Sequence, residues 1–326
     1  MITRLLIYFL FTLSSIYALE SIKTTFDLSE VKDFKLYSNY MLTATNEKLK
    51  LYQDELEFKW ELNNLNYNFH SFKFEFNTLY ALDKQNKLYQ ININSGVEEE
   101  ITSIKNIEHF DVRYPYIIAL SKDNTLYAYD ITKNIILWDL KVSCSDVFFS
   151  AINEYVGCLE KKQFTLYDTL QGEKFYTKKI RGSQLSFYSS DNKGVYFKQG
   201  NKIMYFNVRT KQFEPIYDEK NDIISMIRQK EMIVIDRVDS RLKCVNINSK
   251  AVRWVYPIEK ELTLIQHYPS KILIEDNNHF KLLNNFSGTI ELNVTNNLNL
   301  ELEALHMFEN KYYFITKNKT YLVVKD

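Results

Sequence analysis

Asn124-Thr-Leu-Tyr-Ala-Tyr-Asp-Ile-Thr-Lys-Asn-Ile-Ile-Leu-Trp138 is the stretch of sequence that decides the fold. It begins with a run of apolar and aromatic residues that ends at Asp130, continues through a polar turn at 132–134, and resumes with a second apolar run that carries Trp138. Short runs of this kind, separated by a turn rich in Thr, Lys and Asn, are typical of two consecutive β-strands. The same arrangement recurs along the whole chain.

A polar residue closes the first strand of each copy, at intervals of 38 to 41 residues. In chain order these residues are Gln53, Asn92, Asp130, Asp168, Asn207, Asn246, Asn284 and Lys325. The residues four places and one place before them are apolar or aromatic in every copy. All three tryptophans, Trp60, Trp138 and Trp254, fall seven or eight residues after the polar residue. The chain is therefore an internal repeat of eight copies.

A period near 39 with several short strands and no amphipathic helix is typical of a propeller blade. In the third copy we predict strands at 107–112, 116–121, 125–131 and 135–142. The eighth copy lacks a fourth strand, and the segment Ser21–Leu28 alternates like one. We therefore predict an all-β, single eight-bladed β-propeller with four-stranded blades, closed where this segment pairs with the strand ending at Lys325. A solenoid, the alternative, would need atypical capping repeats.

The composition is that of an ordinary globular chain with a bias towards strands. Of its 326 residues, 45% are apolar and 25% are charged, and 41 basic residues balance 41 acidic ones. This balance, without blocks of like charge, argues against a nucleic-acid-binding surface or a disordered tail. The 24 Tyr and 22 Phe favour strands. Because 7 Gly and 4 Pro are few for an all-β protein, we expect Asn, Asp and Lys in the turns.

The N-terminal residues are typical of a secretory signal peptide. Arg4 provides a positive charge, Leu5–Tyr17 form an apolar run, and Ala18 is a suitable cleavage position. This run is too short to span the roughly 30 Å of hydrocarbon in a bilayer as a helix. We therefore predict a signal peptide at residues 1–18, a propeller at residues 19–326, and a location in the endoplasmic reticulum lumen or outside the cell. An uncleaved anchor is the alternative.

Cysteines and glycosylation motifs bear on the same compartment. An oxidising compartment would permit a disulfide between Cys144 and Cys158, with Cys244 left over. The odd count and the lack of metal-like spacing favour three packed thiols instead. Candidate N-glycosylation motifs begin at Asn285, Asn293 and Asn318. In a chain so rich in Asn, these motifs add little to the prediction of secretion.

Three of the copies resemble the repeat of pyrroloquinoline-quinone-type propellers. They are NTLYAYDITKNIILWDLKV (Asn124–Val142), RLKCVNINSKAVRWVYPI (Arg241–Ile258) and TLYALDKQNKLYQININSG (Thr78–Gly96). The resemblance covers essentially the chain after the signal peptide, although glycine stands in the repeat turns only at Gly96, Gly172 and Gly288. Quinoprotein dehydrogenases, the bacterial outer-membrane assembly lipoprotein, luminal stress-sensor kinases and subunit 1 of the endoplasmic reticulum membrane protein complex share such repeats.

Features that the sequence lacks argue against several of these families. The lipoprotein needs a cysteine directly after the signal peptide, and the nearest one here is Cys144. The sequence carries no kinase domain, no later membrane-spanning run, and no adjacent cysteines such as quinoprotein dehydrogenases place over their cofactor. A WD-repeat assignment fails because Trp138-Asp139 stands in one copy only. The resemblance that remains is to the N-terminal luminal propeller of the membrane-complex subunit.

This resemblance implies a non-catalytic luminal scaffold without a cofactor, which binds partner proteins of a membrane-protein insertion or folding assembly. The alternative is a ligand-binding or enzymatic, quinoprotein-like propeller that uses its central channel. Four histidines lie near the expected innermost strands and could line that channel: His70, His109, His267 and His306. Their offsets differ and no Cys or carboxylate recurs beside them, so we expect no metal site. No known catalytic motif occurs, so we expect no enzyme.

Overall fold

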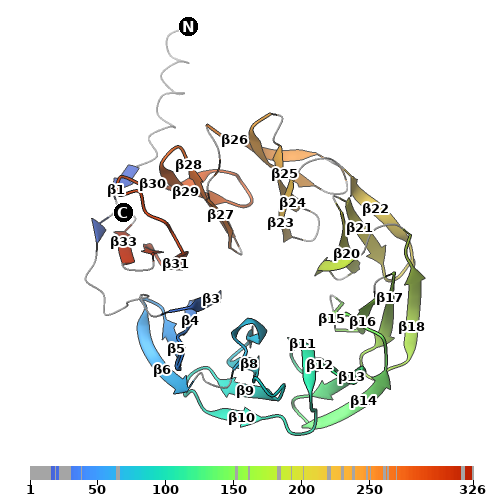
Figure 1. The fold of residues 1–326 in the computed structure, drawn as a ribbon. Helices are drawn as coiled ribbons and strands as arrows, with labels where there is room; N and C mark the ends of the chain where they lie inside the picture. Colours follow the sequence, from blue (N-terminus) through green and yellow to red (C-terminus); the bar gives the residue numbers. More distant parts are fainter. Residues whose placement is uncertain are drawn as a thin grey trace.

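A computed structural model gives the fold of the chain. It describes residues 16–18, 20–21, 31–37, 39–63, 67–150, 153–160, 162–181, 185–191, 193–200, 202–218, 222–228, 231–236, 239–246, 249, 251–259, 262, 264–268, 270–316 and 320–324. Within these ranges the strands form eight sheets, which follow one another around a ring (Figure 1). The prediction of an all-β, eight-bladed β-propeller is confirmed.

Each blade runs from an innermost strand outward in chain order, and its strands pair antiparallel. Blade 1 comprises β3 (Asp33–Tyr37), β4 (Tyr40–Ala44), β5 (Lys48–Gln53) and β6 (Glu57–Asn63). Blade 2 comprises β7 (Lys73–Glu75), β8 (Thr78–Leu82), β9 (Leu88–Asn92) and β10 (Glu98–Glu100), preceded by the short 3-10 helix η2 (Phe69–Ser71). Blade 3 comprises β11 (Ile107–Arg113), β12 (Tyr116–Ser121), β13 (Thr125–Asp130) and β14 (Ile135–Lys141). Blade 4 comprises β15 (Asp146–Phe149), β16 (Tyr155–Glu160), β17 (Gln163–Asp168) and β18 (Lys174–Lys179).

The second half of the ring repeats this order. Blade 5 comprises β19 (Ser186–Ser190), β20 (Gly194–Gln199), β21 (Lys202–Asn207) and β22 (Phe213–Asp218). Blade 6 comprises β23 (Asp222–Arg228), β24 (Glu231–Asp236), β25 (Arg241–Asn246) and β26 (Val252–Pro257). Blade 7 comprises β27 (Leu264–His267), β28 (Lys271–Asp276), β29 (His279–Asn284) and β30 (Ile290–Thr295). Blade 8 comprises β31 (Ala304–Phe308), β32 (Lys311–Ile315) and β33 (Thr320–Val324), joined by an N-terminal strand described below.

The repeated polar residue builds the turn between the third and fourth strands. In blade 3, Oδ1 of Asp130 accepts the backbone N–H groups of Thr132 and Lys133 at 2.9 and 3.1 Å. The equivalent oxygens accept N–H groups from the same turn in five other blades: Asn92, Asp168, Asn207, Asn246 and Asn284. A short Asn or Asp side chain reaches its own turn in this way, which explains why six of the eight copies carry one of these two residue types.

Tryptophans of the fourth strands join neighbouring blades. Nε1 of Trp138 on β14 donates to the carbonyl of Thr169 in the next blade at 2.8 Å, and its ring lies against Gly172 of the same turn. Trp60 and Trp254 contact the following blade in the same way. Each of the three glycines has a positive φ near 70° and no room for a Cβ beside the indole. The few turn glycines of the repeat are therefore those that receive a tryptophan.

The hydrophobic core is divided among the seams between blades. In the described residues, eight buried clusters each combine side chains from two neighbouring blades. The cluster between blades 4 and 5, for example, contains Phe164 and Phe206, whose ring centroids are 5.1 Å apart. Both faces of a blade must therefore be apolar, as the sequence pattern indicates.

The ring closes through an N-terminal strand, of which the structure describes two residues. Strand β2 (Glu20–Ser21) pairs antiparallel with β33, with Glu20 opposite Leu322 and Ser21 opposite Tyr321. It provides the fourth strand of blade 8, so closure by an N-terminal strand is confirmed. The predicted segment Ser21–Leu28 contributes only Ser21, and its remainder lies outside the described residues.

A further N-terminal strand adds to blade 7. Strand β1 (Ile16–Ala18) pairs with β30 in parallel, which gives this sheet five strands (Figure 1). It falls inside the predicted signal peptide, so cleavage after Ala18 would remove β1 and leave β2 in the chain. Among the described residues, no helix is long and apolar enough to cross a membrane.

The structure joins Cys144 and Cys158 in a disulfide, with their Cα atoms 5.3 Å apart. The bridge ties the connection between blades 3 and 4 to β16. Cys244 on β25 is a free, fully buried thiol, and burial raises its pKa to about 12. The preference of the sequence analysis for three thiols is therefore wrong, because a spacing of 14 residues brings two of them together across a hairpin.

Candidate functional site

The four predicted channel histidines have different positions. His109 lies on β11, the innermost strand of blade 3, and is exposed. His306 lies on β31 but is 2% exposed, because it is packed in the seam between blades 8 and 1. His267 lies on β27, and His70 lies in η2 rather than on a strand. Among the described residues, no group of His, Cys, Asp and Glu side chains could hold a metal ion.

The channel wall around His109 carries charges of both signs. Nζ of Lys73 on β7 lies 3.4 Å from Oδ1 of Asp111 on β11. Burial raises the pKa of the Asp146 carboxyl on β15, and the neighbouring His109 and Lys73 act in the opposite direction. The wall is therefore polar and mixed in charge, without a nucleophile and base in hydrogen-bond contact among these residues.

His306 joins the last blade of the repeat to the first by a hydrogen bond. Its Nε2 is hydrogen-bonded to the backbone carbonyl of Asp54 in blade 1. A carbonyl only accepts, so Nε2 carries the proton. Burial lowers the pKa of His306, which keeps the ring neutral. Beside it, Lys311 of blade 8 forms an ion pair with Glu55 of blade 1.

The glycosylation motifs differ in accessibility. Asn285 is fully buried, and its Nδ2 donates to the carbonyl of Tyr268 at 3.1 Å, so a glycan cannot attach there in the folded protein. The position of Asn285 therefore argues against glycosylation there. Asn293 is half-buried on β30, opposite Ile16 of β1. Asn318 lies outside the described residues.

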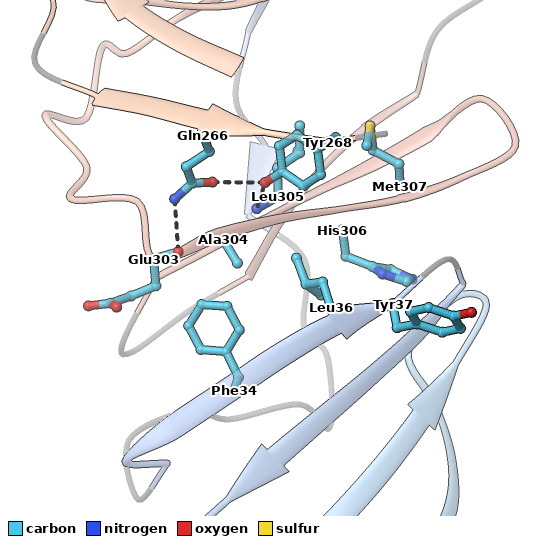
Figure 2. Close-up of a pocket in the computed structure, with 10 residues that line it drawn as sticks. All are labelled: Phe34, Leu36, Tyr37, Gln266, Tyr268, Glu303, Ala304, Leu305, His306 and Met307. Atoms are coloured by element: carbon cyan, nitrogen blue, oxygen red, sulfur yellow. Dashed lines mark hydrogen bonds between the residues drawn. The ribbon is translucent and has the colours of Figure 1, made fainter. Parts of the chain in front are cut away.

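A pocket of about 660 Å³ opens at the seam where the ring closes (Figure 2). Its apolar wall combines Phe34, Leu36 and Tyr37 of β3 with Leu305 and Met307 of β31. Figure 2 shows these two groups on opposite strands, with His306 between them. We call this the seam pocket. It brings blade 1 together with blades 7 and 8, which lie at the other end of the sequence.

The polar groups of the seam pocket bond to one another. Nε2 of Gln266 donates to the carbonyl of Glu303 at 3.0 Å, and the hydroxyl of Tyr268 donates to Oε1 of Gln266 at 2.8 Å. The same hydroxyl accepts the backbone N–H of Leu305 at 3.0 Å. In Figure 2 the carboxylate of Glu303 points away from the other lining side chains. The wall thus presents mainly apolar surface to the pocket.

A row of aromatic side chains continues from the seam pocket across blades 1 to 3. Tyr37 stacks on Phe74 of β7, with ring centroids 4.7 Å apart and planes at 7°. Phe76, in the turn after β7, meets the ring of Tyr114 at 5.3 Å and 81°. Tyr37, Phe76 and Tyr114 are 39%, 69% and 48% exposed. We call these four residues the aromatic row.

The backbone holds the aromatic row in place. The N–H of Tyr114 donates to Oε1 of Glu75 at 3.1 Å, and its carbonyl accepts Nδ2 of Asn153 at 3.2 Å. Phe76 has a φ of 51°, a left-handed conformation that bulky residues seldom adopt. An exposed ring at a position that suits Gly or Asn points to a function rather than to folding.

Comparisons with known proteins agree on the fold. No protein-family model matches the sequence, and no curated protein matches it. The chain is similar to the solved structure of the computationally designed Ika8 protein, with a TM-score of 0.62 and 12% identity over 94% of this chain and 98% of that one. It is also similar to the C-terminal WD40 domain of Sif2, with a TM-score of 0.60 and 10% identity over 95% and 99%.

A third similar structure is BamB from Moraxella catarrhalis, with a TM-score of 0.53 and 13% identity over 95% of this chain and 98% of that one. At these identities the similarity is one of fold. It includes a WD40 domain although the chain lacks the WD-repeat signature, because propellers of different repeat families share one architecture. The comparisons therefore support the propeller fold that the strand pairing shows.

Sequence analysis missed both the seam pocket and the aromatic row. A signal for the row exists, because Tyr37, Phe76 and Tyr114 each lie 16 residues before the polar residue of their copy. Tyr268, in the wall of the seam pocket, has the same position in blade 7. Blade 5 has Asp191 at this position. The columns that define the repeat build strands, whereas this column lies at the end of the first strand or in the turn after it.

Proposed function

We propose that the chain is a non-catalytic scaffold that binds partner proteins through the aromatic row. A propeller presents two broad faces lined by turns, and the turns between first and second strands of all blades emerge on the same face. The aromatic row lies in or beside these turns in three successive blades. Binding by a rigid face requires no reactive group.

The observation that carries this proposal is the exposure of the aromatic row. A large ring that is more than a third exposed contributes little to the core, yet three such rings lie together here. Aromatic side chains are enriched in the energetically important part of protein interfaces. Because hydrogen bonds fix the turn of Tyr114, ordering this surface on binding costs little entropy.

We further propose that this scaffold works in the lumen of the secretory pathway, as a pyrroloquinoline-quinone-type propeller in an assembly like the endoplasmic reticulum membrane protein complex. The signal-like N-terminus and the repeat phrase at Asn124–Val142 support this location and family. The disulfide between Cys144 and Cys158 suits an oxidising compartment.

Affinity purification from native membranes in mild detergent tests the proposal. The Phe76→Ser/Tyr114→Ser protein should lose its partners, with a fall in affinity of about 30-fold, or roughly 2 kcal/mol, because these are the two most exposed rings of the row and they pack against each other. Recovery of membrane-protein insertion subunits with the wild-type chain would support the proposed assembly.

Two control variants make this experiment specific. Leu170→Ser/Val252→Ser removes exposed apolar side chains from other blades and should leave partner recovery unchanged. His109→Ala removes the exposed channel histidine and should also have no effect. Partner loss in the His109→Ala protein, with full recovery in the aromatic variant, would favour a site in the channel instead.

A further inference from the structure

We propose that the seam pocket binds a small, uncharged, apolar molecule. The pocket shares Tyr37 with the aromatic row, but it takes a different kind of ligand and does not depend on the proposed scaffold function. The size of the pocket, about 660 Å³, lies in the range of ligand sites, which is roughly 300–1,000 Å³.

The residues that line the seam pocket disfavour a charged ligand. The hydroxyl of Tyr268 and the amide of Gln266 are engaged with each other and with backbone groups, so a polar ligand finds these groups already occupied. His306 donates its Nε2 proton to Asp54 and is neutral, because burial disfavours the imidazolium. An ion placed here would lose its hydration shell without a compensating partner. A neutral wall therefore complements a neutral ligand.

The apolar side chains that line the seam pocket favour an apolar ligand. Phe34 and Leu36 of blade 1 pack with Ala304 of blade 8, and Met307 of blade 8 lines the pocket on the side of blade 7 (Figure 2). Phe34, Leu36 and Met307 are only partly buried, so an apolar molecule would remove their remaining surface from water. Met307 is flexible and polarizable, and it adapts its side chain to ligands of different outline.

Ligand binding in this place is linked to closure of the ring. The two apolar groups come from the first and the last blade, so a bound molecule contacts both ends of the repeat at once. A ligand that binds the closed ring and not the unfolded chain stabilises the folded state by mass action. We therefore expect the melting temperature to rise with ligand concentration.

The full chain and N-phenyl-1-naphthylamine, an uncharged apolar dye that fluoresces in apolar surroundings, provide the test. Wild type should bind the dye saturably and melt at a higher temperature with it. Met307→Glu should weaken binding at least 30-fold, and Met307→Gln, which keeps the side-chain length, should weaken it less. Leu298→Glu introduces the same charge at a 49% exposed site outside the pocket and should bind like wild type.

Strand content and dye-free melting temperature of each variant show whether it is folded. If Met307→Glu does not fold, the comparison of Met307→Gln with wild type decides. Equal dye affinity in wild type and in the folded Met307 variants would overturn the proposal, as would dye binding without a rise in melting temperature. Partner recovery by Met307→Gln should stay intact, which separates this site from the aromatic row.

Discussion

The turn at Gly172 shows how little room the contact between two blades leaves for a side chain. An ideal Cβ on this residue would lie 2.8 Å from Cγ of Trp138, and φ is +70°. The turn therefore has two separate reasons to require glycine. One is the left-handed backbone, which costs most other residues about 1–2 kcal/mol. The other is the indole ring of the preceding blade.

Replacing this glycine should destabilise the protein for both reasons. We expect Gly172→Ala to lower the free energy of unfolding by about 2–4 kcal/mol, from left-handed strain plus overpacking. Gly200→Ala is the matched control, because Gly200 has a φ of 61° in an exposed turn and should cost only about 1 kcal/mol. Urea unfolding measures both. Equal losses in the two variants would show that the indole contact contributes nothing.

His306 should make the stability of the ring depend on pH. Burial lowers its pKa in the folded state, so the unfolded chain takes up the proton more readily. The contribution of neutral His306 to the free energy of unfolding is complete above the ordinary histidine pKa of about 6.5. It is lost as the pH falls below that value. Between pH 7.5 and 5.5, wild type should lose up to about 1.4 kcal/mol more than His306→Gln, whose amide can still donate to Asp54. Urea midpoints of both proteins at the two pH values check this. Equal losses of stability in wild type and in His306→Gln would contradict it.

At the scale of the strands, the sequence predicts most of the blade. The four strands expected in the third copy agree with β11 to β14 to within one residue, because alternation and turn residues are local signals. Ring closure was placed on Ser21–Leu28, whereas β2 ends at Ser21. A two-residue strand carries no pattern of its own, and its register with β33 depends on where the eighth blade meets the first.

Closure by β2 can be tested with shortened chains. A chain that begins at residue 30 lacks the fourth strand of blade 8 and should lose several kcal/mol of stability, because β33 becomes an exposed edge. A chain that begins at Glu20 retains β2 and loses only β1, so it should melt close to the full chain. Thermal melts of the two proteins decide. Identical melting temperatures would show that β2 does not contribute to closing the ring.

For the molecule as a whole, the sequence predicts the ring but not its binding surfaces. The number of blades follows from counting copies, and the seams follow from apolar residues on both faces of each strand. The seam pocket could not be predicted, because blade 1 comes to lie beside blades 7 and 8 only when the ring closes. The histidines were grouped by their distance from the repeat, but His306 turns into a seam while His109 faces solvent.

The compartment of the protein can be determined from its thiols. If the chain enters the secretory pathway, its mature form should begin near Glu20 and contain one titratable thiol after denaturation, Cys244, and three after reduction. Reduction should lower the free energy of unfolding by about 3 kcal/mol, as expected for a loop of this length. N-terminal sequencing and thiol titration provide the measurements. A protein that retains Arg4 and has three reactive thiols would contradict entry into the oxidising secretory pathway.

Because of the tryptophan contacts, some pairs of neighbouring blades should resist a pulling force more strongly than others. They lie between blades 1 and 2, blades 3 and 4, and blades 6 and 7. Under a pulling force on both chain ends, these three pairs should each yield as one unit, whereas blades 5 and 8 should detach singly. The extension trace should therefore contain long steps of two blades, about 78 residues by the repeat length, among short steps of one. Changing Trp138 to Leu should split one long step into two short ones.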